Sequence, residues 1–496
     1  MENKSTIKYV TNSFVWGVVA KLLDAGIKFL TIPFLLRYFG KENYGLLTLA
    51  IATNAYMTLF DMGVNTGAVK FFSQWIASGK YDLLHRVAQT NITFYLGVSF
   101  INSIVLVALG TWGESIFQVT PEQFVTFRYL LYILAIFSIV QWINSVFNQL
   151  LIADERIAFI QQIGSIRSIL GLILVGVTVL FKWPLVHYFF VYVSIDILVV
   201  MSCLVLCKKR DLIVSVWPAF YWKEFSIVFK YGLAILAMSL FQYTATQSRP
   251  LILGIFSNSG IGILSEYRVI EVFPVFIISL SGMLISIFLP KTAKAIHSNN
   301  KVAIEKMAYE GTKYTSILVS ILCFPVILNA QELLILYVGS EYSHLTLWLS
   351  VWIFTLILSL HNSPVSSLVL ATGKTRMLVY SSAIACVVSI VINVLFCNTL
   401  GVGSAVIGYL VYLIIQMSYY YFYFNNKILG LDSFKVFKSF VVPTLIGLIT
   451  FLCMFIFKLK TDSLLLQVIL NTGVWFAGYI SCLFLFRIID KRFFGF

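Results

Sequence analysis

The feature that most constrains this chain is a long series of apolar blocks. A helix needs about 20 apolar residues to cross a bilayer. Fourteen blocks approach or exceed that length: 12–36, 44–68, 88–112, 127–151, 160–181, 184–206, 231–256, 262–289, 314–338, 345–370, 377–397, 402–424, 439–457 and 464–487. Because lipid offers no hydrogen-bond partners, backbone amides there must be satisfied within each segment. We therefore expect an all-α polytopic membrane protein with about fourteen transmembrane helices.

Composition supports this fold class. Of the 496 residues, 59% are hydrophobic and only 11% are charged, whereas a soluble domain carries roughly 25% charged residues. The mean hydropathy is +0.91. So few charges exclude a soluble enzyme, a nucleic-acid-binding domain, a coiled coil and a disordered chain. A membrane β-barrel would alternate apolar and polar residues in segments of about 10, and the solid apolar blocks do not.

The lysines and arginines give the expected orientation. With fourteen spans both termini lie on one side. Of the 35 Lys and Arg, 25 then fall on the side of the termini, including Arg156 and Arg167, and four lie inside spans. The opposite side has six: Arg37, Lys41, Arg128, Lys182, Lys458 and Lys460. Basic residues concentrate in cytoplasmic loops, so we expect both termini to be cytoplasmic.

A basic linker divides the chain. We expect four parts: 1–207 as an N-terminal lobe with spans 1–6, 208–230 as a cytoplasmic linker, 231–424 as a C-terminal lobe with spans 7–12, and 425–496 as spans 13–14 with a cytoplasmic tail. Each lobe opens with a Lys-Tyr pair, Lys8-Tyr9 and Lys230-Tyr231. Two repeated six-helix lobes around a central cavity, related by pseudo-two-fold symmetry, are a common transporter plan.

Charged residues inside the spans are candidate site residues. The cations are Lys21, Lys28, Arg249 and Arg268, and the acids are Asp24, Asp61, Asp196, Glu266 and Glu271. A charge near the bilayer centre costs at least about 2.5–3.5 kcal/mol, so such groups face a bundle interior or a wet cavity.

Spacing brings some of these charges together. Lys21, Asp24 and Lys28 stand at i, i+3 and i+7 and share one helical face, as do Arg268 and Glu271 at i and i+3. Two interpretations remain open for them: a binding site, or structural pairs between a cation and its local acid. For Asp61, near the cytoplasmic end of its span, a structural helix–helix bond is an equal alternative. Asp196 has no cation near it in sequence.

Uncharged polar residues extend the candidate site. Gln141, Asn144 and Asn148 form a stripe at i, i+3 and i+7 in the fourth span, and Gln242 begins a polar stretch in the seventh. The tenth span is interrupted by His361-Asn362-Ser363-Pro364. Ordinary interhelical hydrogen bonding is the alternative for each residue.

The sequence contains no motif for several common kinds of chemistry. No GxxxxGK[ST] sequence occurs, so we expect neither nucleotide hydrolysis nor a cofactor. No cluster of His, Cys and Asp predicts a metal site, and the seven scattered Cys are interpreted as packing residues. A membrane polysaccharide polymerase or ligase would carry a large extramembrane loop, whereas the longest connections are 207–230 and 290–313.

Three short motifs carry a family resemblance: Gly40-Lys41-Glu42-Asn43-Tyr44-Gly45-Leu46, Asp61-Met62-Gly63 and Ala371-Thr372-Gly373-Lys374. Together with the plan of fourteen spans, they resemble Wzx-type O-antigen or polysaccharide-unit flippases of the multidrug/oligosaccharidyl-lipid/polysaccharide exporter superfamily. The family's lumen is strongly cationic, whereas here four intramembrane cations accompany five acids.

The resemblance implies a function. Such proteins move undecaprenyl-pyrophosphate-linked oligosaccharides across the bacterial inner membrane by alternating access, in contact with membrane lipids and alongside a polysaccharide polymerase. It implies that Lys21, Lys28, Arg249 and Arg268 receive the pyrophosphate and that Gln242 and Asn144 contact the sugars. Asp24, Glu271 and Asp61 are then candidates for coupling to protons or sodium ions. Two alternatives stay open: a cation-coupled multidrug exporter of the same superfamily, and a membrane polymerase or ligase.

Overall fold

The regular structure is helical throughout the described part of the chain. The computed structural model describes residues 2–57, 59–285, 301–372 and 376–488, and no strand occurs within those ranges. The helices are α1 (Glu2–Met57), α2 (Leu59–Ala77), α3 (Tyr81–Trp112), η1 (Gly113–Ser115), α4 (Pro121–Ala153), α5 (Ile157–Leu180), α6 (Leu185–Lys209), α7 (Trp222–Phe256), α8 (Ile263–Ile285), α10 (Lys301–Leu328), α11 (Ala330–Val338), η2 (Ser340–Leu345), α12 (Thr346–Leu360), α13 (Ser363–Ala371), α14 (Arg376–Leu400), α15 (Val402–Tyr419), η3 (Tyr420–Ile428), α16 (Ser433–Ile456) and α17 (Leu464–Leu485). The expected all-α fold class is confirmed.

The apolar blocks fall on these helices, but not one to one, since block 314–338, for example, is divided between α10 and α11. The first two blocks meet within α1 at a kink at Gly40, where φ is 80°, a left-handed conformation that glycine adopts without a Cβ penalty. Block 345–370 is split between α12 and α13 at His361 and Asn362, where the sequence predicts an interruption. Ten helices among the described residues are long and apolar enough to cross a membrane. The count of fourteen stays a prediction.

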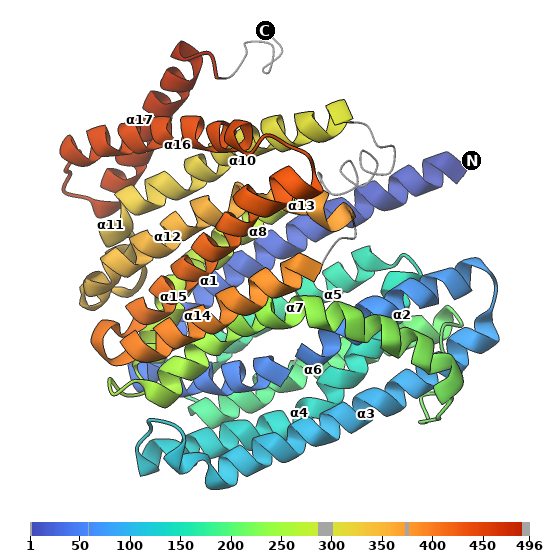
Figure 1. The fold of residues 1–496 in the computed structure, drawn as a ribbon. Helices are drawn as coiled ribbons and strands as arrows, with labels where there is room; N and C mark the ends of the chain where they lie inside the picture. Colours follow the sequence, from blue (N-terminus) through green and yellow to red (C-terminus); the bar gives the residue numbers. More distant parts are fainter. Residues whose placement is uncertain (1, 58, 286–300, 373–375, 489–496) are drawn as a thin grey trace. The chain divides into compact units, whose positions relative to one another are not determined.

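The chain forms two compact units. The first comprises Met1–Ser265 with Val394–Gly401, and the second comprises Glu266–Asn393 with Val402–Phe496. In the first unit, α3 packs on α4, α2 on α7, and α1 on α5 (Figure 1). In the second, α10 packs on α16, α12 and α13. The lobe boundaries drawn at the basic linker stay a prediction.

Large aromatic side chains take part in the core of the first unit. Phe72, Phe147 and Phe225 are fully buried in one cluster that joins α2, α4 and α7, and the cluster also contains Cys203 and Cys207. These two cysteines therefore fill space, as the sequence predicts.

The crossing of α2 and α7 depends on glycine. Gly63 and Gly67 of α2 face Gly232 of α7, and a Cβ atom on Gly67 would lie 2.8 Å from the Val228 carbonyl oxygen. Small residues at this i, i+4 spacing let two membrane helices approach closely. The α2–α7 contact is consequently sensitive to any added side chain.

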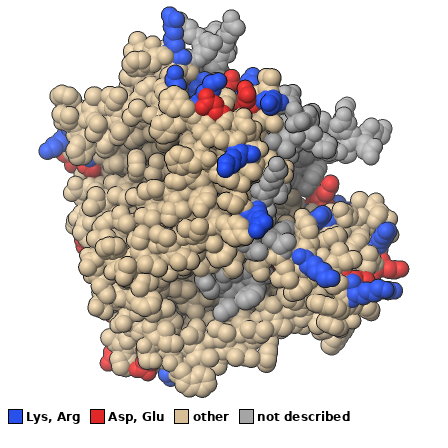
Figure 2. All heavy atoms as spheres, viewed as in Figure 1, with Lys and Arg blue, Asp and Glu red and all other residues tan. Residues whose placement is uncertain are grey.

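The surface agrees with a membrane setting. In the view of Figure 2, most of the visible area carries neither Lys, Arg, Asp nor Glu. Large apolar side chains such as Phe100, Ile136 and Phe422 are more than two-thirds exposed. Exposed apolar area on this scale marks an interaction surface, and on helices of this length and apolarity that surface is suited to lipid.

Candidate functional site

The charged face of α1 contains an ion pair. Lys28 Nζ lies 2.7 Å from Asp24 Oδ2, and Ser168 of α5 donates a hydrogen bond of 2.9 Å to Asp24 Oδ1. The Lys28 and Asp24 side chains are 50% and 42% exposed, so the pair is open on one side. Lys21 is exposed and forms no ion pair with any described residue. The arrangement leaves both ammonium groups accessible to an anionic ligand.

A second charged pair joins α5 to α6. Arg167 binds Asp196 through both carboxylate oxygens, with Nη2 donating to Oδ2 at 3.2 Å. The guanidinium carbon also lies 5.2 Å from the Tyr192 ring centroid. The charge distribution counted Arg167 among the cytoplasmic residues, but the structure places it inside α5. The position of Arg167 within block 160–181 was the sequence signal for its place inside a span. Arg167 is also the cationic partner of Asp196, which has no cation near it in sequence.

The candidates on α7 differ in burial. Arg249 is buried, with 6% of its surface exposed, and its Nε donates to the Ala245 carbonyl at 3.1 Å. Gln242 is exposed two helical turns earlier, and the 242-to-249 spacing sets both residues on one face. The backbone carbonyl of Gln242 accepts a hydrogen bond of 3.3 Å from the Thr246 hydroxyl.

Asp61 lies in a network of neutral donors. Tyr95 of α3 donates to Asp61 Oδ1, Ser145 of α4 donates to Oδ2 at 3.4 Å, and Gln149 donates to the Tyr95 hydroxyl at 2.8 Å. The network ties α2, α3 and α4 together. This geometry accounts for a structural role of Asp61, and its role in ion coupling stays a prediction.

Asn144 is next to this network on α4. Its Oδ1 atom is buried and makes no hydrogen bond within the described residues. The neighbouring Gln141 accepts a hydrogen bond of 3.0 Å from Asn54, which in turn accepts one of 3.1 Å from Asn102. Gln141 of the polar stripe is thus engaged in a helix–helix bond, whereas Asn144 retains an acceptor for other partners.

In the second unit, α8 carries the expected pair of charges. Arg268 binds Glu271 through Nη1 and Oε2, and Tyr267 donates to Glu271 Oε1 at 3.2 Å. The two side chains are 35% and 20% exposed. The convergence of cations from both halves of the sequence on one cavity stays a prediction.

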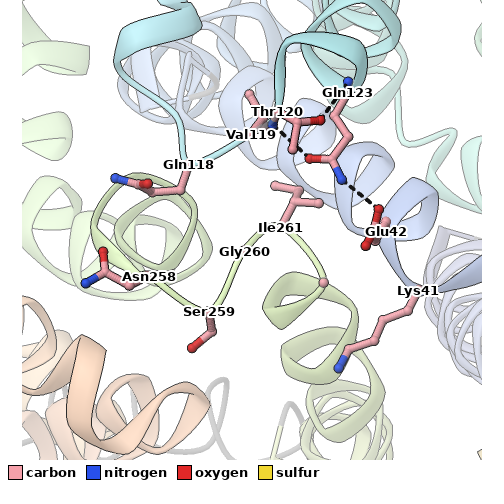
Figure 3. Close-up of a pocket in the computed structure, with 11 residues that line it drawn as sticks. Lys41, Glu42, Gln118, Val119, Thr120, Gln123, Asn258, Ser259, Gly260 and Ile261 are labelled. Atoms are coloured by element: carbon pink, nitrogen blue, oxygen red, sulfur yellow. Dashed lines mark hydrogen bonds between the residues drawn. The ribbon is translucent and has the colours of Figure 1, made fainter.

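A separate polar pocket of about 440 Å³ lies in the first unit, lined by α1, by the start of α4 and by the segment after α7 (Figure 3). Gln123 holds its rim by donating to Glu42 at 2.7 Å and accepting from the Thr120 amide at 3.0 Å. Asn258 and Ser259 contribute from the loop after α7. The contributing segments, which are 41–42 in α1 after its kink, 118–123 at the start of α4, and 258–262 after α7, all belong to the side opposite the termini in the orientation expected from charge.

Comparison with known proteins identifies the family. The sequence matches the family described as "Polysaccharide biosynthesis protein" over residues 10–295, which is more than half of the chain. The chain belongs to this family. The search of curated proteins found no match to this sequence.

Solved structures share the fold of this polysaccharide biosynthesis protein. Lipid II flippase MurJ in an inward closed conformation aligns with a TM-score of 0.72 at 13% identity, over 96% of this chain and 100% of the other. An inward-facing multidrug resistance MATE family transporter of the MOP superfamily aligns with a TM-score of 0.64 at 14% identity, over 88% and 98%. A MOP superfamily transporter from Pyrococcus furiosus, described as having a binding pocket of reverse polarity, aligns with a TM-score of 0.56 at 13% identity, over 90% and 96%. The family match and this shared fold support the resemblance drawn from the sequence.

Proposed function

We propose that the protein is a flippase for undecaprenyl-pyrophosphate-linked oligosaccharides, the repeat units of an O-antigen or exopolysaccharide. It moves them from the cytoplasmic to the periplasmic leaflet of the bacterial inner membrane. Membership of a polysaccharide biosynthesis family and a fold shared with a lipid flippase support this proposal.

The observation that carries the proposal is the open cationic face of α1. Lys21 forms no ion pair with a described residue, and Lys28 pairs with Asp24, whose side chain is about half exposed. Charged side chains on an apolar helix face a polar partner or a water-filled cavity, and they commonly mark a substrate pathway. A pyrophosphate provides several anionic oxygens that form strong, charge-assisted hydrogen bonds with ammonium and guanidinium groups. Arg249 and Arg268 are proposed to complete this site, while Gln242 and Asn144 bind sugar hydroxyls.

Transport would proceed by alternating access. The sugar and pyrophosphate pass through a cavity between two lobes that rock against each other, while the polyprenyl tail stays in lipid. Asp24 pairs with Lys28, and Glu271 pairs with Arg268. Both cations belong to the proposed pyrophosphate site. When the pyrophosphate binds that cation, the carboxylate loses its partner and takes up a proton or sodium ion instead. Asp61 is the third candidate for this coupling.

We also propose that both termini are cytoplasmic. Two contacts within the first unit support the expected alternation. Arg210 pairs with Asp154 at 3.0 Å, both in loops assigned to the cytoplasm, and Tyr38 donates to the Trp183 carbonyl at 3.2 Å, both at the opposite end. Reporter fusions after Lys209 and Asn426 should read cytoplasmic, and one after Tyr342 should read periplasmic. Opposite readings at two of these sites would overturn the orientation.

A multidrug exporter is the second candidate, because MATE transporters share the fold. Such an exporter is expected to use an acidic, aromatic cavity for organic cations. The deciding experiment locates lipid-linked units in a deletion strain. A missing flippase traps them on the cytoplasmic face, a missing polymerase or ligase leaves them on the periplasmic face, and a missing drug exporter causes no accumulation. Periplasmic units, or none, would overturn the flippase proposal.

A further inference from the structure

A pocket in the second unit is distinct from the proposed transport site. It has a volume of about 360 Å³ and lies where α10 packs along α16, close to Ile488 beyond the end of α17. Three lysines border it, Lys313 of α10 with Lys435 and Lys438 of α16. We call it the lysine pocket. Its remaining lining is mainly apolar and includes Val442 and Pro443.

The helical register explains why these lysines meet. Lys435, Lys438 and Val442 stand at i, i+3 and i+7 on α16 and share a face. Tyr309 and Lys313 stand one turn apart on α10. The packing of α10 against α16 therefore sets Lys313 opposite the short basic stripe of Lys435 and Lys438, with an apolar strip leading away from them.

The lysine pocket has no counter-ion within the described part of the chain. No acid lines it, and none of its three lysines pairs with a described carboxylate. Asp432 is nearby in sequence but caps α16, accepting hydrogen bonds from the Phe434 amide at 2.9 Å and the Lys435 amide at 3.4 Å. Three like charges at one pocket repel each other, so a bound anion would stabilise the arrangement.

The position of the lysine pocket indicates the kind of anion. Lys313 directly precedes the apolar block 314–338, and Lys438 directly precedes 439–457, so both lie at a boundary between water and lipid. Basic pockets between transmembrane helices on the cytoplasmic side bind anionic lipid headgroups. We infer that the lysine pocket binds the phosphate headgroup of an anionic membrane phospholipid, with an acyl chain along Val442 and Ile488.

The test uses the full-length protein in detergent, titrated with phosphatidylglycerol and followed by native mass spectrometry. Replacing one lysine of the pocket by Gln should weaken binding about fivefold, and replacing all three should weaken it on the order of 100-fold. Replacing all three by Arg should leave the affinity within about twofold. The matched control is Lys208→Gln, Lys209→Gln and Lys223→Gln, an equal loss of charge in the first unit, and it should bind like the wild type.

Four outcomes would overturn the inference. They are unchanged phosphatidylglycerol affinity in the triple Gln variant, equal binding of zwitterionic phosphatidylcholine, displacement of the lipid by millimolar inorganic phosphate, and occupation by undecaprenyl phosphate that phosphatidylglycerol does not displace. The last outcome would assign the pocket to the transport substrate. If the triple variant unfolds, Lys438→Gln alone measures the fivefold effect. Binding is measured without transport, so the result is independent of the proposed flippase activity.

Discussion

Replacing Asp24 by Asn separates the ionic role of this residue from its structural role. In the structure Asp24 accepts a hydrogen bond from Ser168 at 2.9 Å and pairs with Lys28 at 2.7 Å. An asparagine Oδ1 still accepts from the Ser168 hydroxyl, so the link between α1 and α5 is retained. The substitution therefore removes mainly the charge that holds Lys28.

The expected magnitude follows from the exposure of the pair. Both side chains are about half exposed, and an ion pair of this kind contributes about 0.5–1 kcal/mol. Freeing Lys28 from its carboxylate should then raise the affinity for a pyrophosphate-linked substrate roughly two- to fivefold. The acceleration of transport by a proton gradient should be lost, because the variant has no carboxylate at this position to exchange the cation for a proton.

The assay is flipping of a fluorescent lipid-linked oligosaccharide in proteoliposomes, measured with an imposed proton gradient and after its collapse. Ser168→Ala is the matched control, because it removes the other hydrogen bond of Asp24 and leaves the charge in place. It should keep the response to the gradient. Glu271→Gln should behave like Asp24→Asn. If both neutral variants transport normally and respond to the gradient like the wild type, these acids are structural partners and the coupling argument fails.

Three further predictions concern charge and packing. Lys28→Arg and Arg249→Lys should retain partial transport in a complementation assay, whereas Ala or Glu at either position should abolish it; equal activity of Arg and Ala at position 28 would contradict a charge requirement. Arg167→Leu should lower the free energy of unfolding by about 2 kcal/mol, less than the 3–5 kcal/mol of a fully buried pair, because the pair is a quarter to a third exposed; adding Asp196→Leu should restore most of it in thermal unfolding, and no recovery would refute the pairing argument. Gly67→Leu should destabilise the α2–α7 crossing by about 1–3 kcal/mol, and an unchanged melting temperature would show that the close approach is not required.

The helices were predictable because their signal is local. A block such as 127–151 is apolar over its whole length, and lipid leaves its backbone no alternative to a helix. The structure accordingly extends it to α4, beginning after a capping box in which Thr120 and Gln123 bond each other's backbone amides. The polar interruption at His361 and Asn362 likewise predicted the end of α12.

The partners of intramembrane charges were predictable only at helical spacing. Asp24 with Lys28 and Arg268 with Glu271 are neighbours on one helix, so sequence distance alone brings them together. Arg167 and Asp196 are 29 positions apart on different helices, and their pairing depends on how α5 packs on α6. Counting basic residues by loop also concealed Arg167, because this charge inside block 160–181 was credited to the cytoplasmic side.

The three acids of the first unit that the sequence places inside spans differ in their hydrogen-bond and ion-pair partners, and that difference ranks them for ion coupling. Asp196 is bound by both of its oxygens to Arg167, a bidentate geometry that holds the carboxylate in place. Asp61 is held by neutral hydroxyl and amide donors, which tolerate gain of a proton without leaving a cation unpaired. Asp24 pairs with Lys28, which is half exposed and therefore accessible to a pyrophosphate. Only for Asp24 does substrate binding change the electrostatic environment of the acid directly, so in this unit coupling is expected to begin at α1.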